Sequence, residues 1–114
     1  MEALAQLKHI KQSPRKIRKT LDSVRGMKVG TALNQLHFSP EKAAVFIEKT
    51  LRSAVANFMV KAEDSNLDPE TLKIKEMYVN GGPSMRRFRA ASMGRVSRLN
   101  RPTSHLTIVV TDEN

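Results

Sequence analysis

Cysteine is absent from this sequence of 114 residues, and its absence excludes several kinds of chemistry. A chain without thiols forms no disulfide and no zinc–thiolate site, has no thiol nucleophile, and needs no oxidising compartment. Long hydrophobic runs are missing too, since none approaches the roughly 18 residues of a membrane-spanning helix. The first residues also lack the basic and then apolar pattern of a secretion signal. We therefore expect a protein of the cell interior, with no membrane contact and no transit peptide.

Aromatic residues are few, at 4% of the sequence with no tryptophan, whereas hydrophobic residues as a whole reach 39%. That hydrophobic fraction suffices for one globular core. A chain of this length buries only about two thirds of its unfolded surface, so the core must be small. We expect a single domain over residues 1–114, packed mainly through leucine, isoleucine, valine and alanine.

Acidic residues are scarce relative to basic ones. Eleven Asp and Glu stand against 20 Lys and Arg, which gives a net charge of +9. Such an excess of positive charge is typical of proteins that bind a polyanion, nucleic acid above all. The distribution of the charges along the chain then decides whether they form a binding surface.

Three helices are predicted from the spacing of apolar residues. The first begins at Ser13-Pro14, where serine can cap the helix and proline suits its first turn, and it ends at Gly26. A second, shorter helix is expected over residues 29–36, and the longest over 41–61, after the pair Ser39-Pro40. The apolar positions recurring every three or four residues are Ile17, Leu21 and Val24 in the first helix and Ala44, Ile47, Leu51, Ala54 and Phe58 in the longest.

Two strands are predicted near the end of the chain, at residues 72–79 and 104–111, and they should pair antiparallel. The apolar positions expected on one face are Leu72, Ile74 and Tyr78 in the first strand and Leu106, Ile108 and Val110 in the second. Residues 62–71 contain Asp68-Pro69 and should form a surface linker, because the position before a proline disfavours helix. Residues 1–12 fit either a helix or a strand, and their pattern leaves the choice open.

Residues 80–103 are too long for an unstructured loop inside a compact domain, so we expect them to form a projecting arm. The segment Asn80-Gly81-Gly82-Pro83 loosens the exit from the preceding strand, and Gly94 can form a turn near the middle. The predicted fold is α+β, with three helices packed on a small antiparallel sheet. A long extended β-hairpin arm, residues 80–103, should leave a globular body formed by residues 1–79 and 104–114.

The predicted arm carries arginine but neither lysine nor any acidic residue between Glu76 and Asp112. A guanidinium group binds phosphate through two parallel hydrogen bonds and stacks on bases, which suits structured RNA. The first helix is a second basic surface, with Asp22 as its only acid. The residues predicted to contact RNA are Lys8, Lys11, Ser13, Arg15, Lys16, Arg18, Lys19, Arg25, Lys28 and His105 on the body and Arg86, Arg87, Arg89, Arg95, Arg98 and Arg101 on the arm.

The pattern expected of an enzyme is missing. His9, His37 and His105 lie on separate segments without the close spacing of metal ligands. Any chain of this length offers a serine, an acid and a histidine, so Ser53, Asp22 and His105 make no persuasive triad. No glycine-rich phosphate loop precedes a helix. We expect no catalytic residue, no metal and no cofactor.

Several short segments are similar, in order and spacing, to those of a known family. They are Ser13-Pro14-Arg15-Lys16-Ile17-Arg18, Val24-Arg25-Gly26, Leu51-Arg52-Ser53-Ala54-Val55-Ala56-Asn57, Gly82-Pro83-Ser84-Met85-Arg86-Arg87, Gly94-Arg95 and Thr103-Ser104-His105-Leu106-Thr107-Ile108-Val109-Val110. On these residues the chain resembles the ribosomal protein L twenty-two family of the large ribosomal subunit, from about Leu7 to Thr111. No single segment is specific, but the combination is.

The resemblance implies a small α+β domain near the peptide exit of the subunit, with a hairpin that runs inward to line the nascent-chain tunnel. It also implies that the first segment is a strand. The expected partners are large-subunit ribosomal RNA, neighbouring ribosomal proteins and, near the arm tip, the nascent peptide, without self-association. The expected location is the ribosome, in the cytoplasm or in the matrix of an organelle.

The arm tip departs from the family pattern, which commonly reads Pro-Arg-Ala-x-Gly-Arg. Only the last two positions of that run survive here, as Gly94-Arg95, so the conformation of the tip cannot be carried over. The resemblance makes the following residues the tunnel-lining part of the arm: Met85, Arg86, Arg87, Phe88, Arg89, Ala90, Ala91, Ser92, Met93, Gly94 and Arg95.

Two other functions are compatible with a basic protein of this size. A DNA-bending architectural protein also pairs a small helical body with basic β arms, although such arms insert an apolar or proline wedge that residues 90–93 do not provide. An enzyme acting on RNA is the second. Competition between folded ribosomal RNA and duplex DNA would separate the first alternative from ribosomal RNA binding, and unchanged RNA after incubation would exclude the second.

Overall fold

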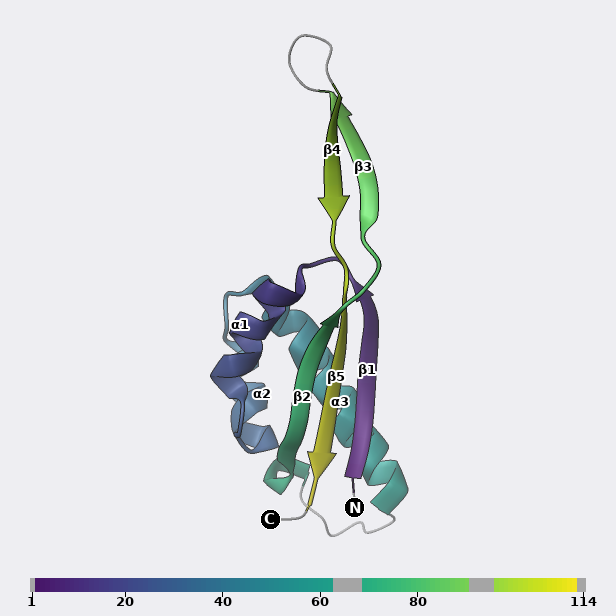
Figure 1. Cartoon of the computed structure of the whole chain (residues 1–114). Helices are drawn as coiled ribbons and strands as arrows, with labels where there is room; N and C mark the ends of the chain where they lie inside the picture. The colour runs from purple at the N-terminus through teal and green to yellow at the C-terminus, as the bar shows by residue number, and fades with distance from the viewer. Residues whose placement is uncertain (1, 63–68, 91–95, 113–114) are drawn as a thin grey trace.

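The computed structural model describes residues 2–62, 69–90 and 96–112. Most of the expected linker and the arm tip, residues 91–95, lie outside these ranges. The elements in chain order are β1 Glu2–Ile10, α1 Pro14–Val24, α2 Val29–His37, α3 Lys42–Ala62, the 3-10 turn η1 Pro69–Thr71, β2 Lys73–Gly81, β3 Met85–Ala90, β4 Val96–Arg101 and β5 Ser104–Thr111 (Figure 1).

The body contains a three-stranded antiparallel sheet in the order β1-β5-β2. The predicted pairing of the strands at 72–79 and 104–111 is confirmed, and β5 is the central strand. The first segment, which its own pattern left open, is a strand, as the resemblance implied. Its small residues Ala3 and Ala5 are buried, which lets α3 pack closely on this edge of the sheet.

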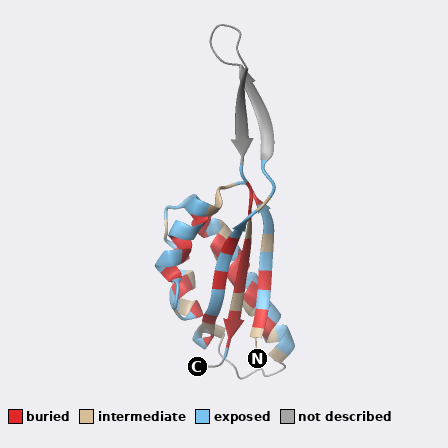
Figure 2. Ribbon diagram, viewed as in Figure 1, coloured by how far each residue is buried: buried red, intermediate tan, exposed pale blue. Residues whose placement is uncertain are grey.

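The helices cover one face of that sheet, with α3 lying along β1 and β5 and α1 lying against β2 (Figure 1). Leu106, Ile108 and Val110 of β5 point to this side and are fully buried, as their alternation predicted. Ile47 and Phe58 of α3 are buried against them. Figure 2 shows the buried residues in red along most of β5 and as separate patches on the helices and on the two outer strands. Burying one such side chain contributes on the order of 2 kcal/mol to stability.

Tyr78 was predicted to share a face with Leu72 and Ile74, and that prediction is wrong. A β-bulge between Ile74 and Glu76 adds one residue to β2 and reverses the alternation beyond it. Met77 and Val79 are buried instead, while Tyr78 is 43% exposed. Lys75, the extra residue, donates a hydrogen bond to the carboxylate of Glu2 on β1. That hydrogen bond lowers the pKa of Glu2 below its ordinary value.

A second irregularity interrupts β1, between Leu7 and Ile10. His9, which lies in this bulge, has φ 61°, a left-handed conformation that residues with side chains rarely adopt. Holding a non-glycine residue there costs about 1–2 kcal/mol, so its surroundings must fix it. Its amide donates a hydrogen bond to Nδ1 of His105, 3.1 Å away.

The ends of α1 follow the prediction with one exception. Pro14 occupies the first turn, and Gly26, at φ 80°, turns the chain after the helix. Ser13 stands at the cap position, but its hydroxyl makes no capping hydrogen bond, so that part of the prediction is wrong. The fixed φ of Pro14 already favours a helical start without a side-chain cap.

The predicted hairpin arm is confirmed in its described part. β3 and β4 form a separate antiparallel ladder, from Met85 opposite Arg101 to Ala90 opposite Val96. The arm leaves the body at the end of the sheet where β2 stops and β5 starts (Figure 1). It makes the molecule 66 Å long against 25 and 18 Å in the other directions.

Candidate nucleic-acid interface

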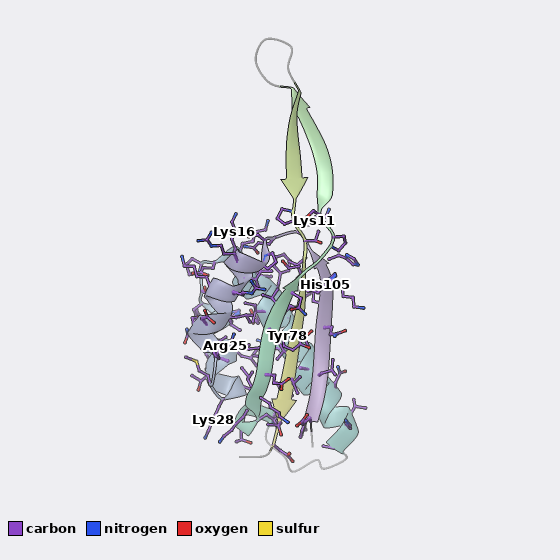
Figure 3. The ribbon with its side chains drawn as sticks, in the orientation of Figure 1. Lys11, Lys16, Arg25, Lys28, Tyr78 and His105 are labelled. Carbon is purple, nitrogen blue, oxygen red and sulfur yellow. The ribbon has the colours of Figure 1, made fainter. Side chains whose placement is uncertain are left out.

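Several basic residues of the body lie close together where the arm begins. The end of β1 and the start of α1 meet there, and Lys11 and Lys16 both lie at this end of the molecule (Figure 3). We call this region the arm-end surface and define it by its exposed basic residues Lys8, Lys11, Arg15, Lys16, Lys19 and Lys42. Sequence reasoning placed five of these in the RNA-binding set and missed Lys42.

Lys42 belongs to this surface because the first turn of α3 packs beside both β1 and α1. It lines a hollow of about 250 Å³ together with Lys16 and Lys19. It also lines a second hollow, of about 360 Å³, together with Lys8 and Lys11. No local sequence signal could reveal this, because residue 42 is distant along the chain from residues 8–19. Lys42 therefore connects two clusters that the sequence shows only as separate lysines.

Negative charge near the arm-end surface is limited. Glu41 lines the smaller hollow, and its carboxylate accepts a hydrogen bond from the hydroxyl of Thr20. Among the residues that the structure describes, none forms an ion pair with the lysines of the surface. None of the described acidic residues therefore competes with an external anion for these ammonium groups.

Arg18 and Arg25, also predicted to bind RNA, face a different environment. Arg18 donates a hydrogen bond to the carbonyl of Val79 at 2.8 Å, and Arg25 donates one to the carbonyl of Met77 at 3.2 Å. β2 is an edge strand, whose outward carbonyls would otherwise be open to pairing with another chain. Both arginines therefore protect the sheet edge, and each guanidinium keeps other N–H groups for a ligand.

Lys28 and His105 occupy the two ends of the body (Figure 3). Lys28 precedes α2 and forms an isolated β-bridge with Lys73, so the structure does not bring it together with the arm-end surface. His105 lies at the base of the arm, with its ring edge-on to that of His9 at 4.9 Å. Since its Nδ1 accepts the amide of His9, the neutral ring carries its proton on Nε2.

The root of the arm is held by a set of contacts that we call the collar, made by Gln12, Gly82, Pro83, Thr103 and Ser104. The amide of Gly82 donates to the carbonyl of Thr103 at 2.8 Å, and the Thr103 hydroxyl donates to the carbonyl of Pro83 at 2.5 Å. The Ser104 hydroxyl donates to the carbonyl of Gln12 at 2.6 Å. A Cβ on Gly82 would lie 2.6 Å from Oγ1 of Thr103, so a larger residue would have to displace the Thr103 side chain.

Arginines on the arm are arranged so that no two lie directly opposite each other in the described ladder. Arg86, Arg87 and Arg89 of β3 face Asn100, Leu99 and Ser97 of β4. Arg98 and Arg101 of β4 face Phe88 and Met85 of β3. Like charges directly opposite would destabilise a two-stranded ladder. Arg95 and the rest of the predicted tip lie outside the described residues.

The described residues provide no group of three or more histidine, cysteine or acidic side chains that could hold a metal ion. Within the same ranges, each helix is too short or too polar to cross a membrane. The exposed lysines of the arm-end surface are groups that can bind anions.

Comparison with known proteins identifies the same family as the sequence motifs. The family model of ribosomal protein L22p/L17e matches residues 5–111. Proteins called large ribosomal subunit protein uL22 from Bifidobacterium longum and Geobacter sulfurreducens are each 44% identical to the chain, and one from Halothermothrix orenii is 43% identical. The alignments cover 99% of this chain in all three, and 97%, 99% and 97% of the respective relatives.

The fold and the charge distribution define a small basic α+β protein with a projecting β-hairpin. Within that class, the chain belongs to the ribosomal protein L22p/L17e family. The resemblance found on the sequence motifs is therefore confirmed.

Proposed function

We propose that this chain is a structural constituent of the large ribosomal subunit, located with the ribosome in the cytoplasm. It binds ribosomal RNA through the arm-end surface and the arm, and the arm extends toward the nascent-peptide exit tunnel. Its partners are ribosomal RNA, neighbouring ribosomal proteins and, at the arm tip, the nascent peptide. It acts as a single copy and catalyses no reaction.

The observation that supports RNA binding best is the arm-end surface itself. Lysines from β1, α1 and α3 converge beside the root of an arm whose described part carries only arginine as charge. A folded RNA presents phosphates over a wide and irregular surface, so two cationic surfaces held at a fixed angle can contact it at several points. The collar supplies that fixed angle.

The test is a salt titration of binding to large-subunit ribosomal RNA. If six to ten basic residues contact phosphates, the logarithm of affinity should fall with the logarithm of salt concentration at a slope of several units, about 0.7–0.9 per contact. A slope below about two would refute a multi-point phosphate interface.

Duplex DNA competing at equal salt tests the architectural alternative. Folded ribosomal RNA should bind more tightly than duplex DNA, because residues 90–93 provide no apolar or proline wedge of the kind that DNA-bending arms insert between base pairs. If duplex DNA displaced the RNA, the DNA-bending function would be favoured instead.

A further inference from the structure

The larger hollow of the arm-end surface has a composition that phosphate binding alone does not require. Its volume is about 360 Å³, at the lower end of the range for sites that hold small ligands. Leu7, Ile10 and Phe46 provide apolar walls, and Lys8, Lys11 and Lys42 provide the cations. It lies between the end of β1 and the first turns of α3, with His9 also on its lining.

The bulge in β1 shapes this hollow. Leu7 pairs with Leu106 and Ile10 with Ser104, so β1 has one residue more than β5 in this interval. His9 takes up the excess in its left-handed conformation, and its hydrogen bond to His105 ties it to the root of the arm. Backbone in such a conformation persists only where the surroundings fix it, and it is common at ligand sites. The hollow is thus fixed in position relative to the collar.

The groups around the hollow favour one kind of occupant. Phe46 is half-buried, so part of its ring remains accessible while the rest packs on the core. Lys8, Lys11 and Lys42 are exposed, and among the described residues none accepts a hydrogen bond from them. An aromatic surface between apolar walls suits a flat base, and lysines at the rim suit the phosphates on either side of it. An apolar side chain from a neighbouring protein would pack against the apolar walls but would leave the three lysines without a negatively charged partner.

We propose that this hollow binds a single unstacked nucleotide of RNA. The base stacks on Phe46, and the flanking phosphates contact Lys8, Lys11 and Lys42. The inference rests on the proposed binding of ribosomal RNA and adds to it a position where the protein holds one base out of the RNA stack.

The first test uses the full chain and large-subunit ribosomal RNA. Phe46→Leu keeps an apolar side chain against the core but removes the stacking surface, so affinity should fall about tenfold. Phe38→Leu is the matched control, since Phe38 is 82% exposed at the end of α2, and it should leave affinity unchanged. Phe46→Tyr retains an aromatic ring and should bind like the wild type. Thermal unfolding of each variant shows whether a loss of affinity reflects a loss of folding.

The second test is ultraviolet crosslinking of the same complex, read by mass spectrometry. We expect a nucleotide adduct within residues 7–11 or 42–46, lost in Phe46→Leu. Lys16→Gln, on the same surface but outside this hollow, separates the two hypotheses. If Lys16→Gln weakens binding while Phe46→Leu binds normally and residues 7–11 and 42–46 carry no adduct, the nucleotide site is refuted and RNA binding stands. If neither variant weakens binding, the proposed function itself fails. A crosslink from this hollow to another ribosomal protein in whole subunits would also overturn the nucleotide site.

Discussion

The basic residues of this protein have different structural roles, although all of them appear in the sequence simply as positive charges. Lys16 is exposed, with no partner among the described residues, whereas Arg18 donates a hydrogen bond to the carbonyl of Val79 on the edge strand. Sequence composition predicted the sign and the approximate position of both. It could not predict the second role of Arg18, because that role depends on a strand more than sixty residues away along the chain.

The two residues should therefore respond differently to substitution. Arg18→Ala should lower the free energy of unfolding by about 1 kcal/mol, because a carbonyl of the sheet edge loses its partner, and should also lower RNA affinity. Lys16→Ala should lower RNA affinity by a similar step without changing stability. Urea unfolding and RNA titration of both variants measure these effects. Equal stability of the two variants would show that the contact at the sheet edge is unimportant.

At the scale of elements, periodicity predicted the helices and β5 well. It failed where a single extra residue changed the alternation. The bulge at Lys75 places Met77 and Val79 in the core and Tyr78 outside, and its sign in the local pattern is that two consecutive polar residues, Lys75 and Glu76, separate Ile74 from Met77. The connection between α3 and β1 that brings Lys42 to the arm-end surface was missed for a different reason, since tertiary packing rather than local sequence determines it.

The role of the collar, the set of contacts where the arm joins β2 and β5, can be tested by a substitution. Gly82→Ala would bring a Cβ within 2.6 Å of the Thr103 hydroxyl and 3.1 Å of the His105 ring. We expect the contacts between Gly82, Thr103 and Pro83 to be disturbed and the arm to change direction, with a loss of about 1–3 kcal/mol in stability. Small-angle scattering of the free protein and binding to ribosomal RNA measure the two consequences.

Thr103→Ser is the matched control, because it retains the hydroxyl that donates to Pro83. It should preserve the scattering profile and the RNA affinity. An unchanged profile and affinity in Gly82→Ala would mean that the close approach at the collar does not set the direction of the arm.

At the scale of the whole molecule, body and arm are held together by different interactions. The body's sheet has the order β1-β5-β2, whereas the backbones of β3 and β4 pair with each other in a separate two-stranded sheet. Deleting Met85–Arg87 should therefore leave the stability of the body unchanged while shortening one strand of the arm by three residues. The charge that the arm presents and the position of its far end should change.

Cells carrying that deletion provide the measurement. Large subunits should still assemble, and their sensitivity to a drug that binds in the exit tunnel should change. If the yield of subunits collapsed, the arm would serve mainly in assembly. If yield and drug response both matched the wild type, the proposed extension toward the tunnel would be wrong.

The central claim, that the arm-end surface attaches this protein to ribosomal RNA, is tested most directly by co-sedimentation with large ribosomal subunits after a high-salt wash. The wild-type chain should remain bound, because many contacts give a high affinity at low salt, of which enough is left after the salt-dependent loss, and because stacking of the bound nucleotide depends little on salt. A variant with Lys8, Lys11, Lys16 and Lys42 all changed to glutamine should be released at lower salt than the wild type. Release of both proteins at low salt, or equal retention of both through the wash, would contradict the account.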